Sequence, residues 1–193
     1  ASQPERAAIP IITAGITFQG LGFCISFMMY SHYIGRLMES GLPCREHRPA
    51  MFICVGPPAF TALALVGMAQ GLPETFRVMG SEDTAADGRM LEILALATGA
   101  FLSALSFWFF CVAAIAVIRS PPRSFHLSWW AMVFPNTGFT IATITLGNAF
   151  DSAGIKGVGS AMTVCIVCMF LFVFFNHSLA VYRQDIMYPG KDE

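Results

Sequence analysis

The chain has 193 residues, of which 55% are hydrophobic and only 12% are charged, and its formal net charge is −1. A soluble domain usually carries about twice that share of charged residues, so the composition argues against a soluble globular protein. Without an excess of positive charge there is also no electrostatic basis for binding nucleic acid.

Five long windows contain no Asp, Glu, Lys or Arg at all: residues 7–35, 49–73, 93–118, 124–150 and 157–182. A helix needs about 20 apolar residues to cross the hydrocarbon core of a bilayer, and charged side chains are costly there. The windows therefore predict an all-α polytopic membrane protein that is solvated by the lipid bilayer. We expect one membrane domain over residues 1–193, with transmembrane helices at about 8–37, 50–71, 90–118, 127–150 and 155–182.

The first predicted helix, residues 8–37, follows an N-terminus with neither an initiator Met nor a basic segment, so no signal peptide is predicted. Small residues recur along this helix and along the third and fifth helices. They allow close helix packing, which matters because lipid provides no hydrophobic drive between helices. These residues are Gly15, Gly20, Gly22, Ala95, Gly99, Ser103, Gly157, Gly159 and Ala161.

The second predicted helix, residues 50–71, is interrupted in its middle by Gly56, Pro57 and Pro58. A proline inside a helix has no N–H and leaves the carbonyl four residues earlier without its partner. The affected carbonyls here belong to Ile53 and Cys54. At membrane depth such groups are tolerated only when they are buried in protein or line a wet cavity.

The fourth predicted helix, residues 127–150, is interrupted in the same way by Pro135, which frees the carbonyl of Ala131. Its sequence VFPNTGFTIA echoes VGPPAFTA in the second helix, since both have Val-X-Pro followed by Phe-Thr. Paired interrupted helices in corresponding positions are typical of a transport site. We therefore predict that the second and fourth helices face one pore. The alternative is a packing kink satisfied by neighbouring helices.

Polar residues follow both interruptions, and we predict that Thr61, Asn136, Thr137 and Thr140 form hydrogen bonds with a substrate. The windows contain no Lys or Arg, so an anion would be held weakly by hydroxyls, amides and helix N-termini, unless another segment supplies a cation. Weak binding suits conduction, because a tightly held ion does not leave. Arg48 precedes the second helix, where it either anchors the helix end or attracts anions to the mouth of the pore.

Catalytic and metal-binding groups are sparse within the windows. Cys165 and Cys168 have the spacing of metal ligands but lie in mid-helix without a second pair, so we expect neither a metal site nor a cofactor. The other ionisable candidates are His32, His126 and His177, and no His, acid and nucleophile share one helix face. We therefore expect a transporter and not an enzyme.

The charges between the windows predict the orientation in the membrane. With five crossings, the C-terminus lies on the more positive side: Arg36, Arg45, Arg48, Arg119, Arg123, Arg183 and Lys191. The opposite side carries fewer positive residues: Arg6, Arg77, Arg89 and Lys156. The positive-inside rule then predicts a cytoplasmic C-terminus and an external acidic loop at residues 71–88.

Two segments resemble a known family. HRPAMFICVGPPAFTALALVGMA (47–69) and LSWWAMVFPNTGFTIATITLGNAF (127–150) resemble the fungal malic-acid transporters. Those belong to the tellurite-resistance/dicarboxylate transporter family, which includes the plant slow anion channels. The resemblance covers residues 8–183 and corresponds to the C-terminal half of a fold with ten helices in five hairpins. It implies that the second and fourth helices line the pore.

In the channel members a phenylalanine in the motif WWxxxFP occludes the pore, and Phe134 matches it, between Trp129-Trp130 and Pro135. The resemblance implies transport of C4-dicarboxylate anions such as malate and succinate across the plasma membrane. It also implies a homotrimer. Because the resemblance covers only half of the fold, we expect an N-terminal five-helix half to complete each pore, and the alternative is a pseudo-symmetric assembly of two copies of this chain. The alternatives are a sulfite or small-anion exporter or channel of the same family, and a fragment that transports nothing.

Overall fold

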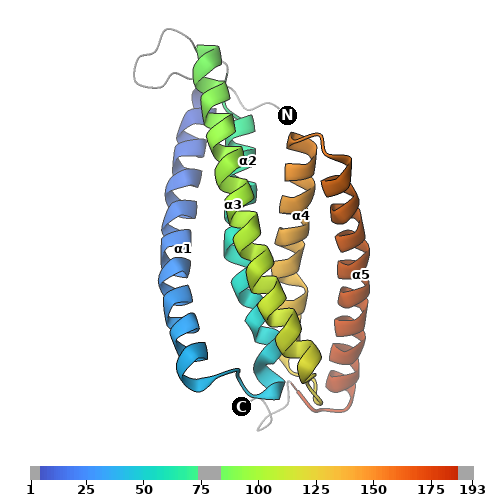
Figure 1. The fold of residues 1–193 in the computed structure, drawn as a ribbon. Helices are drawn as coiled ribbons and strands as arrows, with labels where there is room; N and C mark the ends of the chain where they lie inside the picture. The colour runs from blue at the N-terminus through green and yellow to red at the C-terminus, as the bar shows by residue number, and fades with distance from the viewer. Residues whose placement is uncertain (1–4, 74–83, 187–193) are drawn as a thin grey trace.

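A computed structural model describes residues 5–73 and 84–186, and this part of the chain is all-helical. Its elements are α1 (Glu5–Ser40), the 3₁₀-helix η1 (Arg45–Val55), α2 (Gly56–Gln70), α3 (Thr84–Arg119), the 3₁₀-helix η2 (Leu127–Met132), α4 (Phe134–Ala149) and α5 (Ala153–Tyr182). Consecutive α-helices run in opposite directions along the bundle (Figure 1). The 3₁₀-helices η1 and η2 precede α2 and α4 in the chain. Most of the acidic loop predicted at 71–88 lies outside the described residues.

Four segments of the described chain are long and apolar enough to cross a membrane: Ala8–Ser40, Arg45–Gln70, Ala85–Arg119 and Ala153–Tyr182. These are the helices of a multi-pass integral membrane protein. α4 has only 16 residues, or about 24 Å at 1.5 Å per residue, which is less than the hydrocarbon thickness of about 30 Å. A fifth crossing needs η2 as well, and it stays a prediction.

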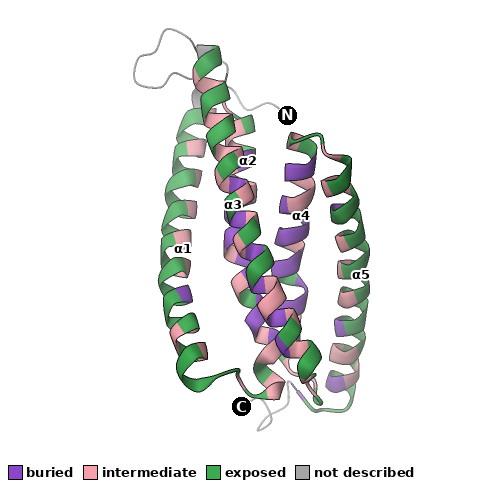
Figure 2. Cartoon of the chain, in the orientation of Figure 1, coloured by how far each residue is buried: buried purple, intermediate pink, exposed green. Residues whose placement is uncertain are grey.

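The helices α2 and α4 lie at the centre of the bundle, and buried residues gather on them (Figure 2). α1 packs against α2, α5 packs against α4, and α3 contacts both central helices. In the most apolar part of α1 no residue is buried, whereas half are buried in η1–α2. Large apolar side chains are exposed along α1, α3 and α5, as expected for helices that face lipid or a further protein segment.

Both central helices begin at a change from 3₁₀ to α geometry. η1 ends at Val55 and α2 starts at Gly56, so Pro57 and Pro58 occupy the first turn of the α-helix. A proline is harmless there, because the first N–H groups of an α-helix have no partner within the helix. A 3₁₀ segment of 11 residues is unusually long, and a 3₁₀ stretch within a longer helical segment often marks a functional hinge or a sequence under strain.

The two carbonyls affected by the prolines of α2 both have partners. The backbone N–H of Gly56 donates to the carbonyl of Ile53. The hydroxyl of Tyr30 on α1 donates to the carbonyl of Cys54 at 3.2 Å. The interruption is therefore satisfied within protein, partly by a neighbouring helix.

Replacing Tyr30 with phenylalanine should lower the stability of the bundle by about 1–3 kcal/mol, because the carbonyl of Cys54 is left without this donor. The measurement is thermal unfolding of the purified protein in detergent. Tyr33→Phe is the matched control, since both tyrosine rings pack against Phe109 and both changes keep the ring. An equal loss in the control would contradict a specific role for the Tyr30 hydroxyl.

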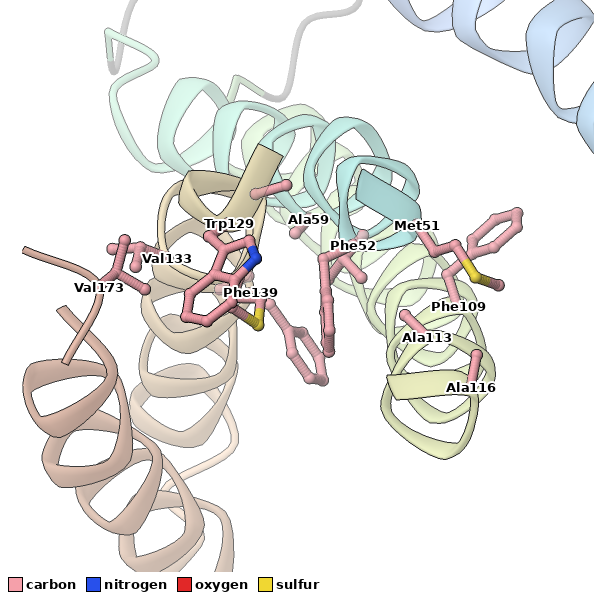
Figure 3. Packing of buried hydrophobic residues seen from close by; sticks show 14 of the residues in the cluster. Met51, Phe52, Ala59, Phe109, Ala113, Ala116, Trp129, Val133, Phe139 and Val173 are labelled. Carbon is pink, nitrogen blue, oxygen red and sulfur yellow. The ribbon is translucent and has the colours of Figure 1, made fainter. Parts of the chain in front are cut away.

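The hydrophobic core lies at the level of the two junctions (Figure 3). This cluster includes Val133, at the η2–α4 junction, and Val173 of α5. Phe52 of η1 packs edge-on against Phe110 of α3, and Phe139 of α4 contacts the same Phe110 ring. The core thus fixes the two junctions relative to the outer helices.

Candidate functional site

One side of the central helices α2 and α4 is only partly covered by other helices in the described part of the chain. Exposed or partly buried residues recur there every seven positions, which is close to two helical turns, so each row follows one face. The two rows are Ile53, Phe60 and Gly67 on η1–α2, and Phe134, Ile141 and Asn148 on α4. We call these six residues the open face. Phe60 and Phe134 contact each other, so the two rows lie side by side.

Phe134, the residue matched to the pore phenylalanine of the channels, begins α4 and is 69% exposed on the open face. Its ring stacks on Phe60, with centroids 5.4 Å apart and an interplanar angle of 29°. α2 and α4 are in contact next to these rings, where a Cβ on Gly56 would lie 3.4 Å from the Cβ of Pro135. Two aromatic rings therefore project together from the point where both α-helices begin.

Phe60 is a residue of this site that the sequence analysis missed. The repeat aligned Phe60-Thr61 with Phe139-Thr140 and gave no hint of a contact with Phe134. In the structure Phe139 is buried against α3, near Phe107 and Phe110. The spacing of seven between Ile53 and Phe60 was the available signal, but many apolar helix faces share that spacing.

Asn136 and Thr140 lie on another side of α4, away from Phe134. Asn136 is 7% exposed, and its Nδ2 donates to the carbonyl of Met132 at 2.8 Å. The Thr140 hydroxyl donates to the carbonyl of Asn136 at 2.8 Å. Both residues line a cavity of about 540 Å³ between α3, α4 and α5, whose other lining residues are apolar. The structure therefore does not bring these two predicted contacts together with Phe134.

Thr61 and Thr137 differ in their surroundings. The buried Thr61 hydroxyl donates to the carbonyl of Pro57 at 2.7 Å and accepts from Nε2 of Gln19 on α1 at 2.8 Å. The Thr137 hydroxyl donates to the carbonyl of Val133 at 3.0 Å, and the residue is only partly buried. Positions three apart are neighbours on a helix surface. Among the four predicted polar contacts, Thr137 is therefore the one beside Phe134.

Arg48 holds the ends of two helices together. Its Nη1 donates to the carbonyl of Ala116 near the end of α3 at 2.9 Å, and its Nε donates to the carbonyl of Pro43 at 3.2 Å. Part of the guanidinium group is thus engaged within the chain, which gives Arg48 a place in the packing. Its attraction for anions stays a prediction.

Arg48→Lys should lower the stability of the bundle nearly as much as Arg48→Ala, by about 1–3 kcal/mol. A lysine keeps the charge but lacks the planar fork that reaches two carbonyls at once. Thermal unfolding in detergent measures the loss. A lysine variant with unchanged stability would contradict the packing role and would leave charge as the property that matters at this position.

Other polar groups of the described residues also serve packing. The Trp130 Nε1 donates to Nδ1 of His177 at 3.2 Å and so ties η2 to α5. The carboxylate of Glu46 accepts from the backbone N–H groups of Arg123 and Ser124, which fastens the α3–η2 loop to η1. The described residues contain no group of three or more His, Cys, Asp or Glu placed to hold a metal ion.

Comparison with known proteins gives matches over most of the chain. Residues 1–178 match the family model described as voltage-dependent anion channel. The chain is 36% identical over its full length to a protein of Schizosaccharomyces pombe inferred to be a malic acid transport protein. It is 31% identical over its full length to the malic acid transport protein of the same yeast. These matches confirm the resemblance predicted from residues 47–69 and 127–150.

The matches also differ in extent. The chain spans 45% and 44% of the two yeast relatives. A sulfite efflux pump of Trichophyton rubrum is 31% identical, but only over 45% of this chain and 23% of the pump. No solved structure gives a significant match.

Proposed function

Because this chain belongs to the voltage-dependent anion channel family, we propose that it carries C4-dicarboxylate anions such as malate through a pore lined by the open face. The observation behind this proposal is the stacked pair of Phe60 and Phe134 on a face that the described chain leaves uncovered. The chain spans about half the length of the curated relatives it matches. An N-terminal five-helix half would therefore complete the pore.

The open face suits a weakly binding anion path. α2 and α4 run in the same direction and both begin near the stacked rings. The N-terminal end of an α-helix carries a partial positive charge, equivalent to about half an elementary charge. Two such starts near the same pair of rings would favour an anion there without a fixed cation, and transporters use interrupted helices in this way. Such attraction is weak enough for the ion to leave.

We assign different roles to the predicted site residues. Phe134 is the gate, and Thr137 beside it is the hydroxyl closest to the anion path. The Nδ2 of Asn136 and the hydroxyls of Thr140 and Thr61 are engaged in contacts within the chain, whereas the buried Oδ1 of Asn136 has no hydrogen-bond partner among the described residues. The proposed role of these three residues is to hold the interrupted helices in shape. They contact substrate only if the complete pore exposes them.

Malate is the first candidate substrate because the relatives matched over the whole chain are named for malic acid transport. Sulfite or another small anion is the second candidate, supported by the shorter match to sulfite efflux pumps. A homotrimer in the plasma membrane, with the C-terminus in the cytoplasm, completes the proposal.

A chimera tests the function. The matching segment of the fission yeast malic acid transport protein is replaced by this chain, and the chimera is expressed in cells that lack their own malate uptake. We expect uptake of labelled malate that excess unlabelled succinate reduces. Sulfite flux without malate uptake would favour the second candidate, and no anion flux despite surface expression would refute transport. The unaltered yeast protein serves as the positive control.

A further inference from the structure

We propose that Phe60 is a positioning residue of the gate: its ring holds Phe134 in its present conformation, and Gly138 provides the space that receives the Phe60 ring. This inference deepens the proposed function and rests on Phe134 as the gate. It assigns a role to a residue of α2, whereas the gate itself belongs to α4.

The contacts of Phe60 are specific. Its ring stacks on Phe134 at a centroid distance of 5.4 Å and crosses Gly138, one turn further along α4. A Cβ on Gly138 would lie 2.6 Å from Cε2 and 2.7 Å from Cζ of Phe60. Real Cβ atoms essentially never come so close to another heavy atom, so only a glycine at position 138 allows this ring position.

Within the described residues, Phe60 is the ring that stacks on Phe134, and the Phe134 side chain is otherwise largely exposed. Any movement of the Phe134 ring away from α2 must therefore break this stack. A stacked aromatic pair shifts a two-state equilibrium by roughly two- to tenfold beyond the effect of the buried area. The contact thus biases the position of the gate without locking it.

The pair joins two separate helices near the point where Gly56 faces Pro135. The position of the gate ring therefore depends on how α2 sits against α4. A ligand or partner that shifts one helix relative to the other would change the population of the closed gate.

The test uses the malate-transporting chimera and compares flux at equal surface abundance. Phe60→Ala should raise malate flux by about threefold, the middle of the range for a stacked pair. The same change in a Phe134→Ala background should add nothing, because the ring it positions is gone. Phe60→Tyr keeps the stack and should behave like the parent. Phe174→Ala, which breaks a similar stack with Phe170 on α5, is the matched control and should leave the flux unchanged.

Gly138→Ala gives a second test that leaves Phe60 in place. The added methyl group must displace the Phe60 ring, so flux should rise as it does in Phe60→Ala. In the Phe60→Ala background the same methyl group meets no ring and should have no further effect. Because alanine favours an α-helix more than glycine does, loss of fold does not explain a rise in flux.

The outcomes separate this inference from the function on which it rests. If Phe134→Ala raises flux but Phe60→Ala and Gly138→Ala do not, the positioning role is wrong and the gate stands. Additive effects of Phe60→Ala and Phe134→Ala would also overturn it. If no variant changes a clear malate flux, Phe134 is not the gate, and absence of flux in the parent chimera refutes the proposed function itself. Should Phe60→Ala fail to reach the surface, Phe60→Leu and Gly138→Ala decide.

Discussion

Phe134→Ala should raise malate flux through the completed pore by about tenfold at equal surface abundance. The ring projects from the open face and is 69% exposed, so nothing in the described chain withdraws it from an ion path. Its removal abolishes a stacked pair worth about 0.5–1.5 kcal/mol. It also widens the hydrophobic constriction proposed for the pore, and such constrictions block ions by dewetting. Uptake of labelled malate by the chimera measures the change.

Phe101→Ala is the matched control for this prediction. Phe101 on α3 is 70% exposed, nearly the same as Phe134, but lies on an outer helix away from the open face. Its loss should leave the flux within twofold of the parent. Unchanged or reduced flux in Phe134→Ala, with normal surface abundance, would show that Phe134 is no gate in this protein.

Gly159→Leu should destabilise the bundle by about 1–3 kcal/mol or more, as expected when a large side chain is forced into a packed contact. Gly159 is where α5 crosses α4. Even a Cβ at this position would lie 2.6 Å from Cγ1 of Ile144 and 3.5 Å from its Cα. A leucine therefore has to push the two helices apart, and the melting temperature in detergent should fall.

Gly157→Leu, two residues earlier on the same helix, provides the control. A Cβ at Gly157 meets no atom within 4 Å, and the substitution brings the same gain in helix propensity. Its melting temperature should equal or exceed that of the parent. Equal losses in both variants would mean that the contact between Gly159 and Ile144 does not hold α5 in place.

These two glycines show how far sequence reasoning reaches. The small residues Gly157, Gly159 and Ala161 predicted close packing of the last helix, but composition does not say which glycine touches a neighbour. That choice depends on the rotation of α5 about its own axis. In the structure this rotation turns Gly159 toward Ile144 of α4, whereas Gly157 faces open space.

For the candidate site, too, one part could be predicted from the sequence and another part could not. The proline motifs at Gly56 and Pro135 identified the two central helices, because a missing N–H is a local property of the chain. Asn136 was predicted as a substrate contact from its position after Pro135, and Phe134 was predicted as the gate from the family resemblance, so both were expected in one site. In the structure they lie on different sides of α4, since residues two apart on an α-helix are separated by about 200°.

By itself the sequence determined the membrane class, the family and the places where the central helices change geometry. Each of these properties can be read from a short stretch of sequence: a charge-free window, a proline or a motif. Whether one segment prefers lipid or water depends mainly on that segment's own residues. Only the tertiary structure decided which sides of α2 and α4 are covered and which stay open. It also decided that the Phe60 ring lies against Gly138 and stacks on Phe134. Those features depend on the mutual rotation and close approach of helices, which the packing of the whole bundle fixes.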